Sequence, residues 1–172
     1  MATLAPPSAP SASTPTPTNQ TSADKITKFG QDETVRYLLD KWLLNFDSNV
    51  EIRYFIGDQS IQPRRGQFLV VWFMQIAADA TPIPLGGFEL RVLNLDSDKL
   101  KGIYKVSKEG TAALALTEFD WSPRLMESGI PYRTGVVFDI RPEDVHFRLQ
   151  YRVPSREFGE GPESAVDIEF NA

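Results

Sequence analysis

Polar side chains, most of them basic, recur at every second position of one short segment, residues 145–153. Its polar positions are His146, Arg148, Gln150 and Arg152, and the positions between them are apolar. In a β-strand this alternation puts the polar set on one face, with the two arginines in line. Guanidinium groups in line suit phosphate or carboxylate ligands, so Arg148 and Arg152 are candidates to contact an anion, RNA or a partner subunit. In the alternative, this face is solvated and pairs with acidic residues of a neighbouring strand.

A second basic feature is the pair Arg64 and Arg65, which lies between Pro63 and Gly66. The flanking proline and glycine predict a turn, and a long apolar run follows it directly. Arginines in such a turn can contact a phosphate backbone, and we count both as candidate nucleic-acid contacts. The alternative is a solvated turn without a ligand.

Residue sets for catalysis or metal binding are missing from the sequence. The chain has no cysteine and one histidine, which excludes thiol nucleophiles, Cys-His zinc sites and centres built on several histidines. It has no nucleophile elbow and no glycine-rich phosphate loop. We therefore expect a protein that is not an enzyme and that has no cofactor and no metal site. Because imidazole titrates near neutrality, the role predicted for His146 is that of a pH-sensitive interface residue.

Residues 94–98 resemble the start of a calcium-binding loop, because their first, third and fifth positions carry Asn or Asp. The rest differs, since Lys99 stands where the loop needs glycine and Lys105 where it needs a bidentate glutamate. An EF-hand is therefore excluded. A looser site made of loop carboxylates between strands stays open.

The segments that must position these residues show the alternation of apolar and polar side chains that is typical of short β-strands. Eight such segments occur, at residues 50–56, 67–77, 88–92, 102–107, 112–119, 136–140, 145–153 and 166–170. Clusters of Gly, Pro and Asp between them are turn signals. The pattern predicts a mainly β fold, an antiparallel β-sandwich of about eight strands that is similar to a jelly roll. The nearly continuous apolar run of residues 67–77 predicts a central strand buried on both faces.

Residues 32–47 predict one amphipathic helix ahead of the strands. Apolar side chains recur there at the spacing of one helical face, at Val35, Leu38, Leu39, Trp42, Leu43 and Phe46. We expect Leu39, Trp42 and Phe46 to form a partner-binding surface or, in the alternative, a stripe packed on the domain's own sheet.

Composition divides the chain near residue 23. Residues 1–23 contain five prolines and no charged side chain, and we expect a disordered arm. Residues 24–172 have the length of one domain, which the pattern above predicts to be a single β-sandwich.

The net charge of −5 disfavours nucleic-acid binding by the domain as a whole, but a local basic face remains compatible with nucleic-acid binding. The sequence shows neither a classical secretion signal nor an apolar run long enough to cross a membrane, so we expect a location in the cytoplasm of a host cell or in a virion.

An uncharged arm joined to a sandwich without a catalytic set resembles, in outline, the plan of small icosahedral coat proteins. That resemblance implies a structural self-assembly protein, a capsid subunit that associates with itself in a shell around nucleic acid. With a neutral arm, RNA contacts would fall to Arg64, Arg65, Arg148 and Arg152. The alternative function is an intracellular β-sandwich binding or adaptor module that recognises a peptide or an anionic ligand.

Overall fold

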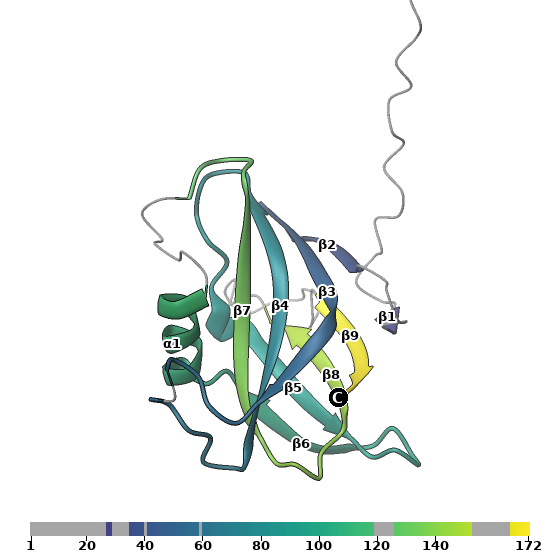
Figure 1. Ribbon diagram of the computed structural model, residues 1–172. Coiled ribbons are helices and arrows are strands. Elements are labelled where there is room, and N and C mark those ends of the chain that lie inside the picture. Colours follow the sequence, from purple (N-terminus) through teal and green to yellow (C-terminus); the bar gives the residue numbers. More distant parts are fainter. Residues whose placement is uncertain (1–26, 29–34, 40, 59, 119–125, 153–165) are drawn as a thin grey trace, which may run out of the picture.

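The computed structural model describes residues 27–28, 35–39, 41–58, 60–118, 126–152 and 166–172. These residues form two β-sheets packed face to face, with one helix beside the second sheet (Figure 1). The five-stranded sheet has the order β1-β9-β8-β5-β6 and the four-stranded sheet the order β2-β3-β4-β7. Neighbouring strands are antiparallel, except for the short parallel pair of β1 and β9. The predicted mainly β, two-sheet antiparallel class is confirmed.

The elements follow one another along the chain with short connections between most of them. Their bounds are β1 Thr27–Lys28, β2 Val35–Leu39, β3 Trp42–Arg53, β4 Gln67–Ala77, a 3₁₀ turn Leu85–Gly87, β5 Phe88–Leu93, β6 Leu100–Lys105, α1 Lys108–Glu118, β7 Pro131–Ile140, β8 His146–Tyr151 and β9 Val166–Asn171. In the described part of the chain, no helix has the length and apolar character needed to cross a bilayer.

The core lies between the two sheets and consists of the inward-facing side chains of strands β2 to β9. Aromatic rings join the layers: Phe73 of β4 lies 5.2 Å from Phe46 of β3 and 5.4 Å from Phe88 of β5, between ring centroids. Alternation along β5, β8 and β9 supplies the apolar side chains of the five-stranded sheet and turns their polar neighbours outward.

Strand β4 is the central strand predicted from the apolar run, and its burial on both faces is confirmed. It pairs with β3 on one side and with β7 on the other. One face contributes Leu69, Val71 and Phe73 to the core between the sheets. On the opposite face, Trp72 belongs to a second apolar cluster, which Leu114 of α1 closes.

The helix predicted over residues 32–47 is wrong wherever the structure describes that segment. Residues 35–39 and 42–47 are antiparallel strands, with Val35 opposite Phe46 and Leu39 opposite Trp42. The apolar residues there also fit a period of two, and pairing of β3 along β4 outweighs the weak helix propensity of single residues. Residues 32–34 and 40 lie outside the described residues, as does the predicted arm.

The partner-binding helix face of Leu39, Trp42 and Phe46 is therefore not formed. Leu39 and Phe46 are buried in the core between the sheets. Trp42 is partly buried, and its indole N–H donates to the carbonyl of Thr81 at 2.7 Å. The alternative, in which these side chains pack within the domain, is the one that the structure supports.

The strand predicted over residues 112–119 is also wrong, because residues 112–118 belong to α1 and residue 119 lies outside the described residues. Ser107 caps this helix, since its Oγ accepts from the N–H of Gly110 at 3.1 Å. The helix is docked on the edge of β7. There the N–H of Val137 donates to the hydroxyl of Thr111 at 3.1 Å, and the carbonyl of Val137 accepts from the N–H of Ser107 at 2.7 Å.

Candidate anion-binding groove

The outward face of β8 carries the alternating polar residues predicted from the sequence, and acidic neighbours pair with its arginines. Arg148 lies 3.4 Å from Glu169 and 3.7 Å from Asp167, both on β9. Arg152 lies 3.4 Å from Glu89 on β5. These ion pairs match the alternative in which the sheet face pairs with its neighbours. Arg148 faces two carboxylates, whereas Arg152 shares Glu89 with Lys105 and is only partly compensated.

Two carboxylates of this face, Glu89 and Asp167, have shifted pKa values with identifiable causes. Burial by itself raises the pKa of Glu89, but a hydrogen bond from Lys105 and the charge of Arg152 outweigh it and hold the pKa below its usual range. For Asp167 burial dominates, and it raises the pKa despite the nearby charge of Arg148. Neighbouring side chains thus set the pKa of Glu89, and burial sets that of Asp167.

The other predicted arginines, Arg64 and Arg65, lie in a different place, beside a groove of about 420 Å³. The groove runs between the turn that precedes β4, the end of β6 and the beginning of α1. Its lining residues are Ile61, Gln62, Arg64, Arg65, Phe68, Ile103, Tyr104, Lys105, Ser107, Lys108, Glu109 and Asp139. Four of these are basic and two are acidic, so the lining has a net positive charge in a chain whose net charge is −5.

Asp139 of β7 holds the arginine turn through its backbone. One carboxylate oxygen accepts from the N–H of Arg64 and the other from the N–H of Arg65, each at 2.9 Å. Gly66 ends the turn with a φ of +123°, and a Cβ there would lie 2.9 Å from the ring of Pro142. The acidic group thus fixes the position of both arginines while the guanidinium groups remain directed elsewhere.

Within the described part of the chain, three basic side chains of the groove lack a close acidic partner. The Arg64 side chain is 82% exposed, and its contact with Glu109 is a loose one of 3.7 Å, of a kind that contributes little. Among the described residues, Arg65 and Lys108 have no salt bridge. Lys105 differs, because its ammonium group pairs with Glu89.

Tyr104 gives the groove a fixed aromatic wall. The Arg65 guanidinium lies 5.1 Å from the centre of its ring, a cation–π distance. The hydroxyl donates to Asp144 at 2.5 Å and accepts from the N–H of Arg141 at 3.2 Å. Burial, with the hydrogen bond to Asp144, raises the pKa of Tyr104, so the ring stays a neutral phenol at physiological pH.

The N-terminal end of α1 adds to the positive potential. Ser107, Lys108 and Glu109 line the groove, and the first turn of a helix carries a partial positive charge. Together with the three available cations, this arrangement suits a phosphate or carboxylate ligand.

Sequence patterns found Arg64 and Arg65 but missed their neighbours in the groove. Lys108 and the N-terminal end of α1 were not predicted, because the sequence pattern after Lys108 predicts a strand. The acidic partners of Arg148 and Arg152 could not be identified from the sequence. Alternation shows that the two arginines share a face, but it does not show which residues of the neighbouring strands lie beside them.

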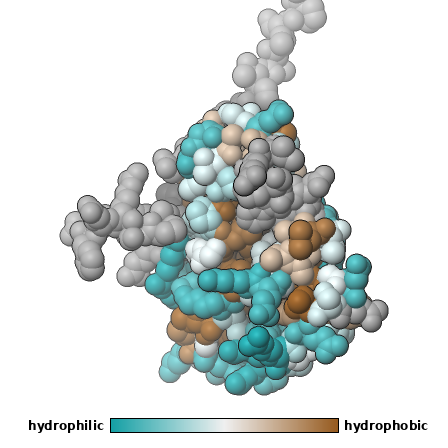
Figure 2. All heavy atoms as spheres, turned by 90° about the vertical axis from the view of Figure 1, so that its left-hand side faces the viewer, coloured by the Kyte–Doolittle hydropathy of each residue, from teal (hydrophilic) through white to brown (hydrophobic). Residues whose placement is uncertain are grey.

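Figure 2 views the molecule from the side on which α1 lies, and the described surface there is mostly hydrophilic, with separate hydrophobic patches. Exposed apolar side chains near the end of β3 include Tyr54 and Phe55, and Leu116 of α1 is 88% exposed.

Comparison with models of known protein families, with curated proteins and with solved structures finds no match for this chain.

Proposed function

We propose that this protein is a structural self-assembly protein of the coat type, whose sandwich binds nucleic-acid phosphates in the basic groove. The observation that carries the proposal is the local excess of positive charge there. Arg64, Arg65 and Lys108 have no close acidic partner among the described residues, although acidic residues outnumber basic ones in the chain as a whole. Cations without a close acidic partner attract phosphates, which release counterions on binding.

The sheet edges support the self-association part of the proposal. Strand β6 is the last strand of its sheet, and its Leu100 and Ile103 are 52% and 43% exposed. Strand β2 ends the other sheet, with Leu38 58% exposed. An edge strand offers unpaired backbone groups, and apolar side chains along it favour contact with another copy.

A jelly-roll arrangement of the sandwich is the finer part of the same proposal. The connections from β4 to β5, from β6 to β7 and from β7 to β8 each pass from one sheet to the other. Such crossings are typical of Greek-key sandwiches, from which jelly rolls are built. The meander of β2, β3 and β4 within one sheet departs from that plan.

Native mass and nucleic-acid content test the proposal. We expect the full chain, purified at low salt, to elute as a large species by size-exclusion chromatography with light scattering, with excess absorbance at 260 nm. Replacement of both Arg64 and Arg65 by Gln should remove the excess at 260 nm. A charge-matched control is the double variant Arg36→Gln with Arg152→Gln, which should keep it. A monomer of 19.3 kDa without nucleic acid would contradict the proposal.

A binding module for an anionic ligand is the second candidate function. The observation in its favour is the size of the groove, about 420 Å³, which lies in the usual range for ligand sites. A small species that binds an acidic or phosphorylated peptide, and that loses binding when Arg64 and Arg65 are replaced, would select this function over the coat.

A further inference from the structure

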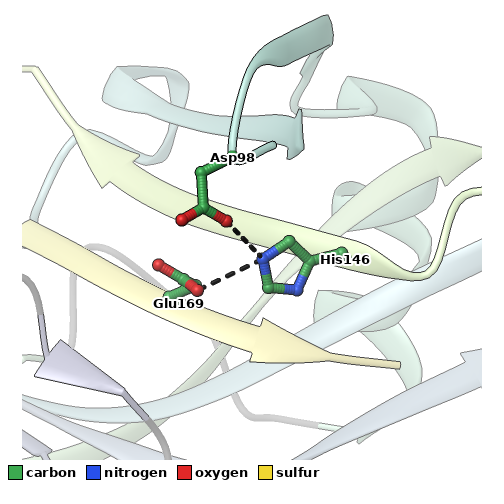
Figure 3. A group of neighbouring side chains, drawn as sticks. All are labelled: Asp98, His146 and Glu169. Atoms are coloured by element: carbon green, nitrogen blue, oxygen red, sulfur yellow. Dashed lines mark ion pairs between the residues drawn. The ribbon is translucent and has the colours of Figure 1, made fainter. Parts of the chain in front are cut away.

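Three ligand-type atoms converge at the end of the five-stranded sheet where β8 begins, and none of them lines the basic groove. They belong to His146 of β8, Glu169 of β9 and Asp98 in the turn between β5 and β6, and all lie within 4.8 Å of one another. Figure 3 shows both carboxylates pointing at the same ring nitrogen. That nitrogen, Nε2, lies 3.2 Å from Oε1 of Glu169 and 3.8 Å from Oδ1 of Asp98.

The other ring nitrogen decides what Nε2 presents to the carboxylates. Nδ1 of His146 lies 2.6 Å from Oδ1 of Asn171. An amide oxygen only accepts hydrogen bonds, so Nδ1 carries the ring proton and donates it. In the neutral ring, Nε2 therefore turns a lone pair toward two negatively charged groups. The three atoms that converge here are then all electron-pair donors, which is the set that a metal cation binds.

We infer that Asp98, His146 and Glu169 form a binding site for a divalent transition-metal ion, with Zn²⁺ as the ion that fits best. Imidazole nitrogen and carboxylate oxygen are both zinc ligands, and tetrahedral bonds of about 2.0–2.2 Å place neighbouring ligand atoms about 3.3 Å apart. The separation of 3.2 Å between His146 and Glu169 agrees with that geometry. Ca²⁺ fits less well, because it takes six to eight oxygen ligands.

Asp98 completes the set with a small movement. Its carboxylate has to approach Nε2 by about 0.5 Å to reach tetrahedral spacing. The side chain is 68% exposed on a turn, so this shift meets little packing resistance. A proton on Nε2 would bridge to Glu169 alone, since 3.8 Å exceeds hydrogen-bond length. A metal ion contacts all three groups, and it leaves a fourth position for water.

The outer partners have the arrangement that surrounds metal ligands in other proteins. Asn171 fixes the orientation of the imidazole through Nδ1. Arg148 lies 3.4 Å from Oε2 of Glu169, which leaves Oε1 facing His146. The Glu169 side chain is 5% exposed, so its position is set by the sheet. Of residues 94–98, which the sequence left open as a looser carboxylate site, this site uses Asp98 alone.

Zinc titration of the tag-free full chain tests the inference, and the single histidine makes the readout specific. We expect isothermal titration calorimetry with ZnCl₂ to show one site. In long-range ¹H–¹⁵N spectra, Nε2 of His146 should shift on saturation while Nδ1 stays protonated. Asp98→Asn should weaken Zn²⁺ binding by about tenfold or more. Asp96→Asn removes the same charge from the same turn, and it should change the affinity by less than about twofold.

Three results would overturn the inference. The first is no binding by the wild type, or binding that leaves the His146 resonances unmoved. The second is an unchanged affinity in Asp98→Asn, and the third is an equal loss in Asp98→Asn and Asp96→Asn, which would indicate attraction to the turn as a whole. Both substituted side chains are exposed, and the spectra of the wild type decide the first result without any variant.

Discussion

Replacing Arg64 and Arg65 by Gln should change how strongly salt weakens nucleic-acid binding. For single strands, each neutralised phosphate contributes about −0.7 to the slope of log K against log salt concentration. Arg64, Arg65 and Lys108 are the groove cations without a close acidic partner among the described residues, so the wild-type slope should be about −2. The double variant keeps Lys108, and its slope should be about −0.7.

The difference is large enough to measure with a labelled oligonucleotide. Between 50 and 200 mM KCl, these slopes predict roughly a 20-fold loss of affinity for the wild type and roughly a threefold loss for the variant. Fluorescence anisotropy with a single-stranded oligonucleotide of mixed sequence gives both values. The control, Arg36→Gln with Arg152→Gln, removes the same net charge from outside the groove and should keep the wild-type slope.

Two outcomes would refute this reasoning. If the control flattens the slope as much as the groove variant, binding depends on overall charge and has no preferred place. If the groove variant keeps a slope near −2, phosphates do not enter the groove. In either case Arg64 and Arg65 would be solvated turn residues, the alternative that the sequence left open.

Three further predictions concern stability. Tyr151 is buried with a hydroxyl that has no hydrogen-bond partner among the described residues. Tyr151→Phe should therefore raise the free energy of unfolding by about 1 kcal/mol, whereas Tyr37→Phe, which removes a 2.8 Å hydrogen bond to a carbonyl, should lower it by about 1 kcal/mol in urea denaturation. Burial also raises the pKa of Tyr151 to about 12. The stability of the wild type should therefore fall between about pH 10 and pH 12, and that of Tyr151→Phe should fall less. A loss of stability in Tyr151→Phe at neutral pH would contradict the argument from the unpartnered hydroxyl. Because the folded pKa of Glu89 is lowered, the ionised carboxylate stabilises the fold above about pH 4.5, and this stabilisation is lost as the pH falls. Urea titrations at several pH values should therefore show the stability of Glu89→Gln approaching that of the wild type in acid. A stability difference that stays constant with pH would contradict this prediction.

The strands of the sandwich were predictable wherever one period was dominant. The run of residues 67–77 is β4 with the same bounds, and alternation located β5, β8 and β9. In these segments, local pattern and tertiary pairing favour the same structure. Their side-chain periods could therefore be read without knowledge of the neighbouring strands.

The sequence failed where two periods fit one segment. Residues 35–47 satisfy a helical stripe and a hairpin alike, and the choice depends on β4, which lies more than twenty residues further along. Over residues 112–119 the error is the reverse, because a strand was predicted where a helix forms. Ala113, Leu114, Ala115 and Leu116 look like part of a strand, but Ser107 caps a helix there and β7 binds it through Thr111.

Function depends on which charges remain without a partner, and a linear pattern cannot count them. Arg148 and Arg64 have the same side chain, and both were reasonable candidates for an anion contact. Strand β9 places Glu169 opposite Arg148, so that arginine stabilises the sheet. At Arg64 the nearby carboxylate of Asp139 binds backbone N–H groups instead, and the guanidinium stays in solvent. Only the pairing of β8 with β9 and the position of β7 distinguish the two residues, which is why an acidic chain can still present one basic groove.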